Sequence, residues 1–587
     1  MQYIGTTFTR GLLAAAITAS LAACGGGSSS DSSNLIEADV SAGSGGSFSN
    51  ANGKITVEVP AGALAEDAVL TVSKVSDGSL ATASAFADDD FASDAYRIRV
   101  RTRAGQDVTL DKPIKLVLRA ERAPTHPTLG EVARFQDGEW QRINASFFRH
   151  LSQNAVALTS TSETTVRVVM RTLQRTSGDA VSRGQAVMMD ETFGNEAFFG
   201  GVIGLHTLLE GVTPADTVAL GVQVDITKLP QSVIDLMTGS DLAAKDAALS
   251  DPATTRVLLQ NDAVIGVRAR FDGNGNMVSA GLTCALCHVN AAPTEFQLSS
   301  GTVALPIGAP QFDGVPNSKI DAGAILALTP FVQGLGDGGA TAAVLNGWGP
   351  GNFDIRALPD NVLEDGVVNP TNNPPIWNFV DLESQGYLFG WDGLFVNDGS
   401  NNNALASQAE AVFDLVMHGN GAFGTSAGTL PPELSVAPPQ ALLDALAQAE
   451  ASQPGNDVTA DKLLDLQAWM RSITSPAPGA YDETLAERGF ELFHGDAGCV
   501  ACHQSAELTG PGTFTAITNP QGGLAGGIKV PSLRGISHTA PYLSDGSVPT
   551  LEAAVDGVLQ VLEGIDPTRP DFSADDRAAL VEYLKSL

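Results

Sequence analysis

The chain is 587 residues long and 43% of it is hydrophobic, which is enough for several domains with substantial cores. Its formal net charge of −33 disfavours nucleic acid as a partner, because binding to phosphates needs a basic surface. The same charge suits a small basic partner protein, although the solubility of an exported protein would account for it equally well.

The N-terminus has the features of a lipoprotein signal. Arg10 precedes an apolar run from Leu12 to Ala23, which is too short to span a bilayer as a permanent helix. The run leads directly into Cys24, so we expect residues 1–24 to form the signal segment and Cys24 to be the lipidated residue. The protein would then be exported to the periplasm or cell surface and held at the outer membrane, with residues 25–39 as a flexible tether. An uncleaved anchor is the alternative.

Residues 40–180 predict an all-β sandwich. Alternating apolar and polar positions, separated by turn-forming residues, predict strands at Ile55–Val59, Val69–Val75, Tyr96–Val100, Ile114–Leu118 and Thr165–Met170. The stretch Val59–Leu64 (VPAGAL) resembles a motif of the β-sandwich module found in ankyrins and netrin receptors. No catalytic constellation is present here, so a spacer or docking module is the expected role.

From residue 190 onward the pattern predicts two mainly α domains, residues 190–474 and 482–587. One helix is expected over Phe198–Leu209, with an apolar stripe and His206 at its edge. Long loops rich in Gly, Asn and Pro enlarge the first domain, and Ser475–Gly479 is the expected linker between the two.

Two further helices are predicted to close these domains. Thr459 is the expected N-cap of the first, whose inward face would carry Leu463, Leu466, Met470 and Ile473. Ser573 is the expected N-cap of the second, with Asp576 three residues on completing a capping box. The inward face of that last helix would carry Leu580, Tyr583, Leu584 and Leu587.

Two copies of Cys-x-x-Cys-His are the strongest chemical signal in the chain. Cys284 and Cys287 precede His288, and Cys499 and Cys502 precede His503. This spacing is typical of c-type haem attachment, in which both thiols form thioethers with the porphyrin and the histidine binds iron. Zinc, a redox dithiol and a structural disulfide are the alternatives, but none explains a histidine after the second cysteine twice. We therefore expect two covalently bound haems c, with His288 and His503 as proximal ligands.

The last hundred residues resemble the bacterial di-haem cytochrome c peroxidase superfamily. The resemblance rests on Arg488–Phe493, Lys529–Gly535 (KVPSLRG), Thr539–Ser547 (TAPYLSDGS) and Thr550–Val555. It is looser around the first motif, where the spacing of the two motifs is nearer to that of the di-haem rubber oxygenases.

The resemblance implies a division of labour between the two haems. One haem would accept electrons from a small redox protein or a quinol-linked donor, and the other would bind hydrogen peroxide at an open iron position. A tryptophan often helps electrons cross, and Trp391 is the preferred candidate over Trp377. The chain departs from the family pattern in having no Met after Met470 and in having Ser544 where the family has a histidine. Both departures count against a standard peroxidase.

The sixth iron ligands are left open by the sequence. His538 is the candidate distal ligand or catalytic residue at the second haem, and an exposed loop histidine is the competing interpretation. His206, Met417 and His418 are the candidates at the first haem, although a histidine such as His206 on an apolar helix face is often a core residue. His494 is expected to be structural.

A calcium loop is suggested by Asp272–Asn276, but the later ligating glutamate is missing, so a hairpin turn is expected instead.

Three functions remain open at this stage. The first is an exported, lipid-anchored di-haem cytochrome with peroxidase-like oxidoreductase activity. The second is a pure electron-transfer cytochrome with no substrate chemistry, and the third is a di-haem oxygenase acting on an apolar substrate. Whether the protein is an enzyme therefore depends on whether one iron keeps an open position.

Overall fold

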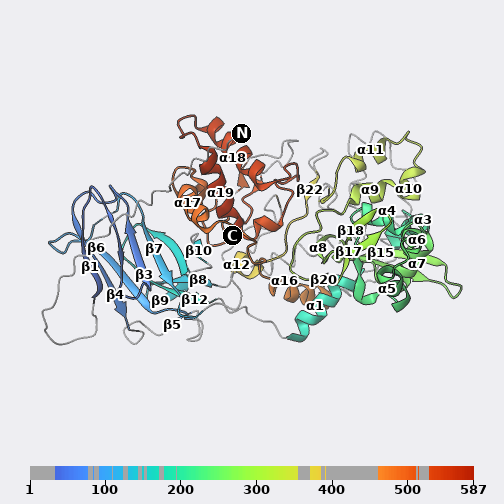
Figure 1. Ribbon diagram of the computed structural model, residues 1–587, viewed down its shortest axis with the longest axis horizontal. Coiled ribbons are helices and arrows are strands. Elements are labelled where there is room, and N and C mark those ends of the chain that lie inside the picture. Colours follow the sequence, from blue (N-terminus) through green and yellow to red (C-terminus); the bar gives the residue numbers. More distant parts are fainter. Residues whose placement is uncertain are drawn as a thin grey trace, which may run out of the picture.

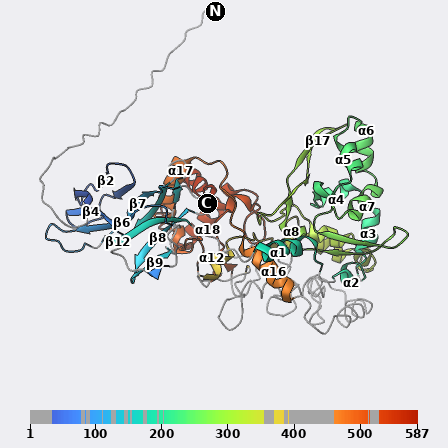
Figure 2. The same ribbon diagram turned by 90° about the horizontal axis from the view of Figure 1, so that it is seen from below.

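The structure is a computed structural model. It describes residues 34–76, 83–84, 91–108, 110–122, 130–142, 148–150, 155–170, 178–192, 195–201, 203–353, 370–384, 391, 460–510, 513–514 and 528–587. We name three parts: the β region (34–170), the first-motif region (178–473) and the C-terminal unit (482–587). The C-terminal unit lies between the other two in space, although it is last in the sequence (Figures 1 and 2). Among the described residues, no helix combines the length and apolar character needed to cross a membrane.

The β region consists of two sheets packed face to face. One sheet has the strand order β1 (Asn34–Val40), β4 (Ala68–Val75), β6 (Ala95–Arg101), β12 (Thr164–Met170), β8 (Gly130–Gln136), β9 (Glu139–Arg142) and β5 (Ala83–Ser84). The other has the order β10 (Phe148–His150), β11 (Ala155–Ser160), β7 (Ile114–Arg119), β3 (Ile55–Val59) and β2 (Gly46–Ser49). All five predicted strands are present, because alternate residues point into the shared core. The predicted tether was too long, since residues 34–39 pair with β4 as part of β1.

The first-motif region mixes helices with β-hairpins. Its N-terminal half contains α1 (Gly178–Asp190), α2 (Glu196–Phe199), α3 (Leu205–Gly211), α4 (Pro214–Ala219), β13 (Val224–Asp225), α5 (Gln231–Thr238), α6 (Leu242–Leu249), α7 (Pro252–Gln260), β14 (Val267–Phe271) and β15 (Met277–Leu282). It continues with α8 (Ala285–His288), β16 (Asn290–Ala291), β17 (Thr294–Leu298), β18 (Gly301–Leu305), β19 (Ile307–Gly308), β20 (Pro310–Gln311), α9 (Ala322–Ala327), α10 (Pro330–Gln333), α11 (Ala340–Asn346), β21 (Asn352–Phe353), β22 (Thr371–Asn372), α12 (Phe379–Ser384) and α16 (Ala460–Arg471).

Two predictions for this region were wrong. The prediction of helices and loops alone missed the hairpins β14–β15 and β17–β18. The single helix expected over 198–209 is broken into α2 and α3, because Gly204 adopts a left-handed φ of 75° that ends helical continuity. The turn at 272–276 is the expected hairpin connection, closed by hydrogen bonds from the backbone of Asn274 and Asn276 to the Asp272 carboxylate.

The C-terminal unit contains α17 (Glu483–His494), α18 (Leu551–Ile565) and α19 (Ala574–Lys585). The predicted capping box is present, since Ser573 accepts from the Asp576 amide and the Asp576 carboxylate accepts from Ser573. The four predicted inward residues of α19 and the chain end are buried: Leu580, Tyr583, Leu584 and Leu587.

The same helix pairing occurs twice. α1 packs on α16, and α17 packs on α19. In each pair a glycine allows close approach, because a Cβ on Gly184 would lie 1.9 Å from the Asp465 carbonyl oxygen and one on Gly489 would lie 2.0 Å from the Ala579 carbonyl oxygen. The first-motif region therefore begins at α1, twelve residues earlier than the boundary predicted at 190.

A buried lysine joins the β region to the C-terminal unit. The side chain of Lys115 on β7 is 10% exposed and lies 2.5 Å from Glu487 and 3.3 Å from Glu491, both on α17. Glu58 on β3 lies 3.5 Å away on the other side. The cation thus fixes one sheet of the β region against the helix that precedes the second motif.

Candidate active site

The first Cys-x-x-Cys-His motif follows a β-hairpin. β15 ends at Leu282, and the motif forms the single helical turn α8, closed by the His288 amide bonding to the Cys284 carbonyl at 3.2 Å. Gly266, at the start of the hairpin, has a φ of 82°, and a Cβ there would lie 2.3 Å from Leu286. The hairpin backbone therefore packs directly under the motif, where only glycine fits.

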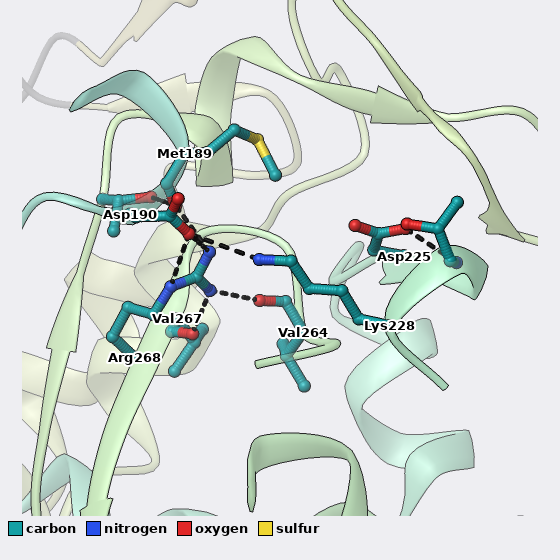
Figure 3. Close-up of polar contacts among 9 residues, drawn as sticks. Met189, Asp190, Asp225, Lys228, Val264, Val267 and Arg268 are labelled. Atoms are coloured by element: carbon teal, nitrogen blue, oxygen red, sulfur yellow. Dashed lines mark hydrogen bonds and ion pairs between the residues drawn. The ribbon is translucent and has the colours of Figure 1, made fainter. Parts of the chain in front are cut away.

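A charged cluster anchors this hairpin to α1 (Figure 3). Arg268 on β14 donates to the Asp190 carboxylate at 2.5 Å and to the Met189 carbonyl at 2.7 Å. Lys228 also approaches Asp190, at 3.3 Å. The Met189 carbonyl additionally accepts from the hydroxyl of Thr283, the residue before the motif, at 3.1 Å. The cluster thus fixes the approach to the first motif, and the two cations lower the pKa of Asp190 against the opposing effect of burial.

Partial burial shifts the pKa values of the imidazole and the two thiols of the first motif. Burial lowers the pKa of His288 to about 4, so the ring is neutral near pH 7. Burial raises the pKa of Cys284 to about 11 and that of Cys287 to about 12, so both are thiols. Nδ1 of His288 is buried without a hydrogen-bond partner among the described residues.

The second motif follows α17 through a left-handed glycine, Gly498, with a φ of 60°. It forms a short 3-10 turn, Cys499–Ala501, and the His503 amide bonds to the Cys499 carbonyl at 3.0 Å. Nδ1 of His503 lies 2.5 Å from the carbonyl oxygen of Leu508. Because a carbonyl only accepts, Nδ1 carries the proton, and the neutral ring then has its lone pair on Nε2, the nitrogen that can bind a metal. The backbone of Pro531 also hydrogen-bonds this ring.

The two motifs differ in exposure. In the first, the residues between the cysteines are buried, with Ala285 0% and Leu286 8% exposed. In the second, Ala501, which lies between the cysteines, and Gln504, which follows His503, are exposed. The turn of the second motif is therefore more exposed than that of the first, although the cysteines and histidines of both motifs are half-buried.

The donor sets of both motifs fit covalently bound haem. The four motif cysteines are free thiols rather than a disulfide, both histidines are neutral with burial lowering the pKa of each to about 4, and Nε2 of His503 is oriented as a ligand. The described residues include no cluster of three or more His, Cys, Asp or Glu side chains suited to a metal ion. A haem iron needs only one protein side chain as a proximal ligand, because the porphyrin nitrogens supply four further ligands.

Trp377 lies between the two motifs. Its side chain is 3% exposed and belongs to the same apolar cluster as Ala285 and Cys284. Its Nε1 donates to the backbone carbonyl of Arg534 at 3.0 Å. Arg534 in turn donates two hydrogen bonds, at 2.9 and 2.6 Å, to the carbonyl of Ala506, three residues after His503.

Trp391 also lies near the boundary between the two parts. Its Nε1 donates to the Asn372 carbonyl at 2.8 Å, and its carbonyl accepts from the Lys529 amide at 2.8 Å. Unlike Trp377, it is not part of the apolar cluster around the first motif among the described residues.

The remaining predicted ligands have different surroundings. Nε2 of His538 is 3.1 Å from the carbonyl of Ala477, which occupies the nitrogen that usually binds iron. His206 lies on α3, and its buried Nδ1 has no partner among the described residues. His494 bonds the Phe490 carbonyl at 2.8 Å through Nδ1 and packs against the Phe490 ring at an interplanar angle of 49°, as expected of a structural residue. Met417, His418 and Cys24 lie outside the described residues.

Comparisons with known proteins identify the C-terminal unit. A cytochrome c family model matches residues 486–587. The methylamine utilization protein MauG of Methylorubrum extorquens is 32% identical over 125 residues, which cover 17% of this chain and 34% of that protein. The cytochrome c551 peroxidase of Nitrosomonas europaea is 33% identical over 115 residues, which cover 17% of this chain and 33% of that protein. The C-terminal unit is a cytochrome c domain, and its similarity to these two relatives supports a place in the di-haem cytochrome c peroxidase superfamily. A cytochrome c domain implies covalently bound haem c, and Cys499, Cys502 and His503 are the residues of this unit that would hold it.

The match to these relatives is partial, since the chain spans about a third of the length of each. A crystal structure of a MauG-like protein associated with microbial copper homeostasis also matches, with 23% sequence identity and a TM-score of 0.19. That match covers 24% of this chain and 60% of the other.

Two features were missed from the sequence. One is the Arg-Gly pair that the two parts share: Arg183-Gly184 on α1 and Arg488-Gly489 on α17. In both places the arginine pairs with an aspartate of the partner helix, at 2.6 Å for Arg183 and 2.5 Å for Arg488. A search for short internal repeats around the two motifs could have found this pair.

The other missed feature is a group of buried oxygens where the two parts meet. Oδ1 of Asn352, Oδ1 of Asn372 and Oδ2 of Asp545 are buried without hydrogen-bond partners among the described residues. Asn352 and Asn372 face each other across β21 and β22, and the Asn372 amide bonds to the Ser544 carbonyl at 2.7 Å. Burying an oxygen acceptor without a partner costs free energy, so we expect a hydrogen-bond donor or a cation to bind these oxygens.

Proposed function

We propose that the chain is a di-haem c-type cytochrome in which electrons pass from the C-terminal haem to a second haem at the first motif, where hydrogen peroxide is reduced. The observation that carries the proposal is Trp377, which packs with the first motif and is hydrogen-bonded to the residue that holds the turn after His503. The repeated helix pairing supports a second cytochrome unit around the first motif.

The protein's own residues have distinct tasks in this proposal. When bound, haem would supply an iron that changes between ferric and ferrous and can bind peroxide. Cys284, Cys287 and His288 would hold it at the first motif as Cys499, Cys502 and His503 do at the second. The Leu508 carbonyl fixes the orientation of His503 and makes its Nε2 a stronger donor.

The direction of electron flow follows from exposure. The exposed turn of the second motif, at Ala501 and Gln504, is accessible to an external donor. The buried turn of the first motif, at Ala285 and Leu286, would limit water on that side of the reacting group, which favours a site of chemistry. Two electrons from the donor and two protons convert one hydrogen peroxide to two water molecules. Trp377 is the proposed path between the two motifs.

The charge distribution supports a basic donor. In residues 34–176 acidic and basic residues nearly balance, so the excess of Asp and Glu lies in residues 177–587, which carry both motifs. A small basic redox protein would be steered to that part of the surface. We also propose that the protein is exported and lipidated at Cys24, because haem c attachment takes place outside the bacterial cytoplasm.

A divalent cation is proposed at the boundary of the two cytochrome units. Asn352, Asn372 and Asp545 offer the oxygen ligands that calcium prefers, and within the described part of the chain none of the three oxygens has a hydrogen-bond partner. The cation would link β21 and β22 to the loop after Pro541, whose carbonyl already accepts from Asn372 at 2.5 Å. The hairpin at 272–276 is not the proposed site, because its carboxylate is already used by the turn.

The test is a spectrum of the purified ferric protein together with its haem content. Two haems per chain, one of them high-spin by electron paramagnetic resonance, and oxidation of a reduced donor that depends on peroxide would support the proposal. Two low-spin haems with no response to peroxide would instead indicate a pure electron carrier. Consumption of dioxygen with an apolar substrate, without peroxide, would indicate an oxygenase.

A further inference from the structure

The turn that follows His503 is held by three side chains through three successive carbonyls. The Ala506 carbonyl accepts from the Arg534 guanidinium, and the Glu507 carbonyl accepts from the Ser532 hydroxyl at 2.7 Å. The third, that of Leu508, accepts from Nδ1 of His503. Leu508 has a φ of 53°, an unusual value for leucine that aims its carbonyl at the ring. The position of this turn therefore sets the hydrogen bond on the iron-binding histidine.

The side chain of Glu507 extends from the same turn into the boundary with the first-motif region. Glu507 is 3% exposed, and its Oε2 accepts from Nδ2 of Asn378 at 2.9 Å. A buried carboxylate is stable only with such donors, so the contact holds the turn in place. Asn378 follows Trp377 directly in the sequence, and it has a φ of 57°.

Asn378 is itself fixed by the segment that directly follows α16. Its amide donates to the Ile473 carbonyl at 3.0 Å, and its Oδ1 accepts from the Ser475 amide at 3.0 Å. Asn378 is 4% exposed and Ser475 is 1% exposed. One buried asparagine thus connects the segment after α16 to the turn after the second motif.

We propose that Asn378 and Glu507 are positioning residues. They couple the position of the first-motif region against the C-terminal unit to the electronic state of the C-terminal haem. The coupling runs from Asn378 through Glu507 to Leu508 and His503. A firm hydrogen bond on Nδ1 makes the imidazole a stronger donor to iron, which stabilises the ferric state and lowers the reduction potential. The contact between the first-motif region and the C-terminal unit then sets the reduction potential of the C-terminal haem. This inference rests on the proposed function and adds a means of tuning to it.

The experiment uses the full chain and four variants. Asn378→Gly removes the side chain but keeps the left-handed backbone, which glycine adopts readily. Glu507→Ala removes the carboxylate, whereas Glu507→Gln keeps an oxygen that can accept from Asn378. Asn274→Gly, in the exposed hairpin turn, is the matched control. The readouts are the midpoint potential and the low-spin signal of the C-terminal haem, amide hydrogen exchange over 503–510, and the rate of electron transfer between haems.

We expect Asn378→Gly and Glu507→Ala to raise the potential of the C-terminal haem, change its low-spin signal and increase exchange at 503–510. Electron transfer between haems should slow by about tenfold. Glu507→Gln and Asn274→Gly should resemble the wild type, and the double variant Asn378→Gly/Glu507→Ala should be no worse than either single one.

Unchanged potential and spectrum in both single variants would overturn the inference, and so would effects that simply add in the double variant. A wild-type protein without haem at the first motif would contradict the proposed function instead, and the shift in the potential of the C-terminal haem would still decide the role of Glu507.

Discussion

Trp377 donates its indole N–H to the backbone carbonyl of Arg534 at 3.0 Å, and so connects the core around the first motif to the C-terminal unit. Arg534 lies in the KVPSLRG stretch that carries the resemblance to the peroxidase superfamily. The two residues are 157 positions apart in the sequence. Through the hydrogen bonds that Arg534 donates to the Ala506 carbonyl, this contact connects the core around the first motif to the turn after His503.

Replacing Trp377 by Phe should slow electron transfer between the haems by about tenfold, because the indole N–H and part of the ring are lost. The Arg534 carbonyl would lose its buried donor, which should also cost about 1–3 kcal/mol of unfolding free energy. Rapid mixing of the reduced protein with peroxide measures the first effect, and denaturant unfolding measures the second.

Trp391→Phe is the matched control for that experiment. Trp391 lies at the same boundary but outside the apolar cluster of the first motif as far as the structure describes it. A larger loss of electron transfer from Trp391→Phe than from Trp377→Phe would show that Trp391 is the electron path, as the sequence first suggested.

Gly489→Ala and Gly184→Ala should each destabilise the protein by about 1–3 kcal/mol or more, since the new methyl group would meet a backbone carbonyl at 2.0 and 1.9 Å. The helices of each pair would have to separate. Gly557→Ala is the control, because it lies within α18 and has nothing within 4 Å of the new Cβ. That variant should be neutral or more stable by about 0.5–1 kcal/mol.

Thermal unfolding of the three variants tests this expectation. If Gly184→Ala were tolerated as well as Gly557→Ala, the close pairing of α1 with α16 would be wrong, and with it the argument for a second cytochrome unit.

Much of the fold could be predicted because it depends on local patterns. The five expected strands follow from strict alternation, and the capping box at Ser573 needs residues only three positions apart. The break between α2 and α3 was missed because a favourable apolar stripe masked the effect of Gly204. The two cysteine motifs could also be predicted, because all the residues that define each motif lie within five consecutive positions.

The rest of the site depends on contacts between distant residues. Asn378 and Glu507 are 129 positions apart, and no pattern in the sequence around either residue predicts their hydrogen bond. The Arg-Gly repeat was also hidden, because the second copy lies close to its motif whereas a long insertion separates Gly184 from Cys284. Only the packing of the helices aligns the two copies.

Lys115→Met should loosen the β region from the C-terminal unit. Burial alone lowers the pKa of this lysine, but the hydrogen bond and the charges of Glu487, Glu58 and Glu491 outweigh that effect and raise it above 10.5. A raised lysine pKa means that the stabilisation is complete below pH 10.5 and is lost as the pH rises through the folded-state value. At neutral pH we expect a loss of about 1–3 kcal/mol, because three carboxylates lose their shared cation.

The control for Lys115 is Lys74→Met, which removes a lysine whose side chain is 53% exposed and forms an ion pair with Asp94 at 2.7 Å. It should change the unfolding free energy by less than about 1 kcal/mol. Equal effects of the two variants, or a stability difference that does not disappear in alkaline solution, would contradict the proposed role of Lys115.

Removal of divalent cations should weaken the contact between the two cytochrome units, if the oxygens of Asn352, Asn372 and Asp545 bind calcium as proposed. Dialysis against a chelator should lower the melting temperature, and added calcium should restore it by mass action. Asp545→Asn should reduce the calcium response, because one negative charge is lost, whereas Asp272→Asn in the exposed hairpin should leave it intact. Isothermal titration of the chelated protein with calcium gives the number of sites directly. No binding to the wild type, or equal binding to Asp545→Asn, would mean that these buried oxygens are satisfied by water instead.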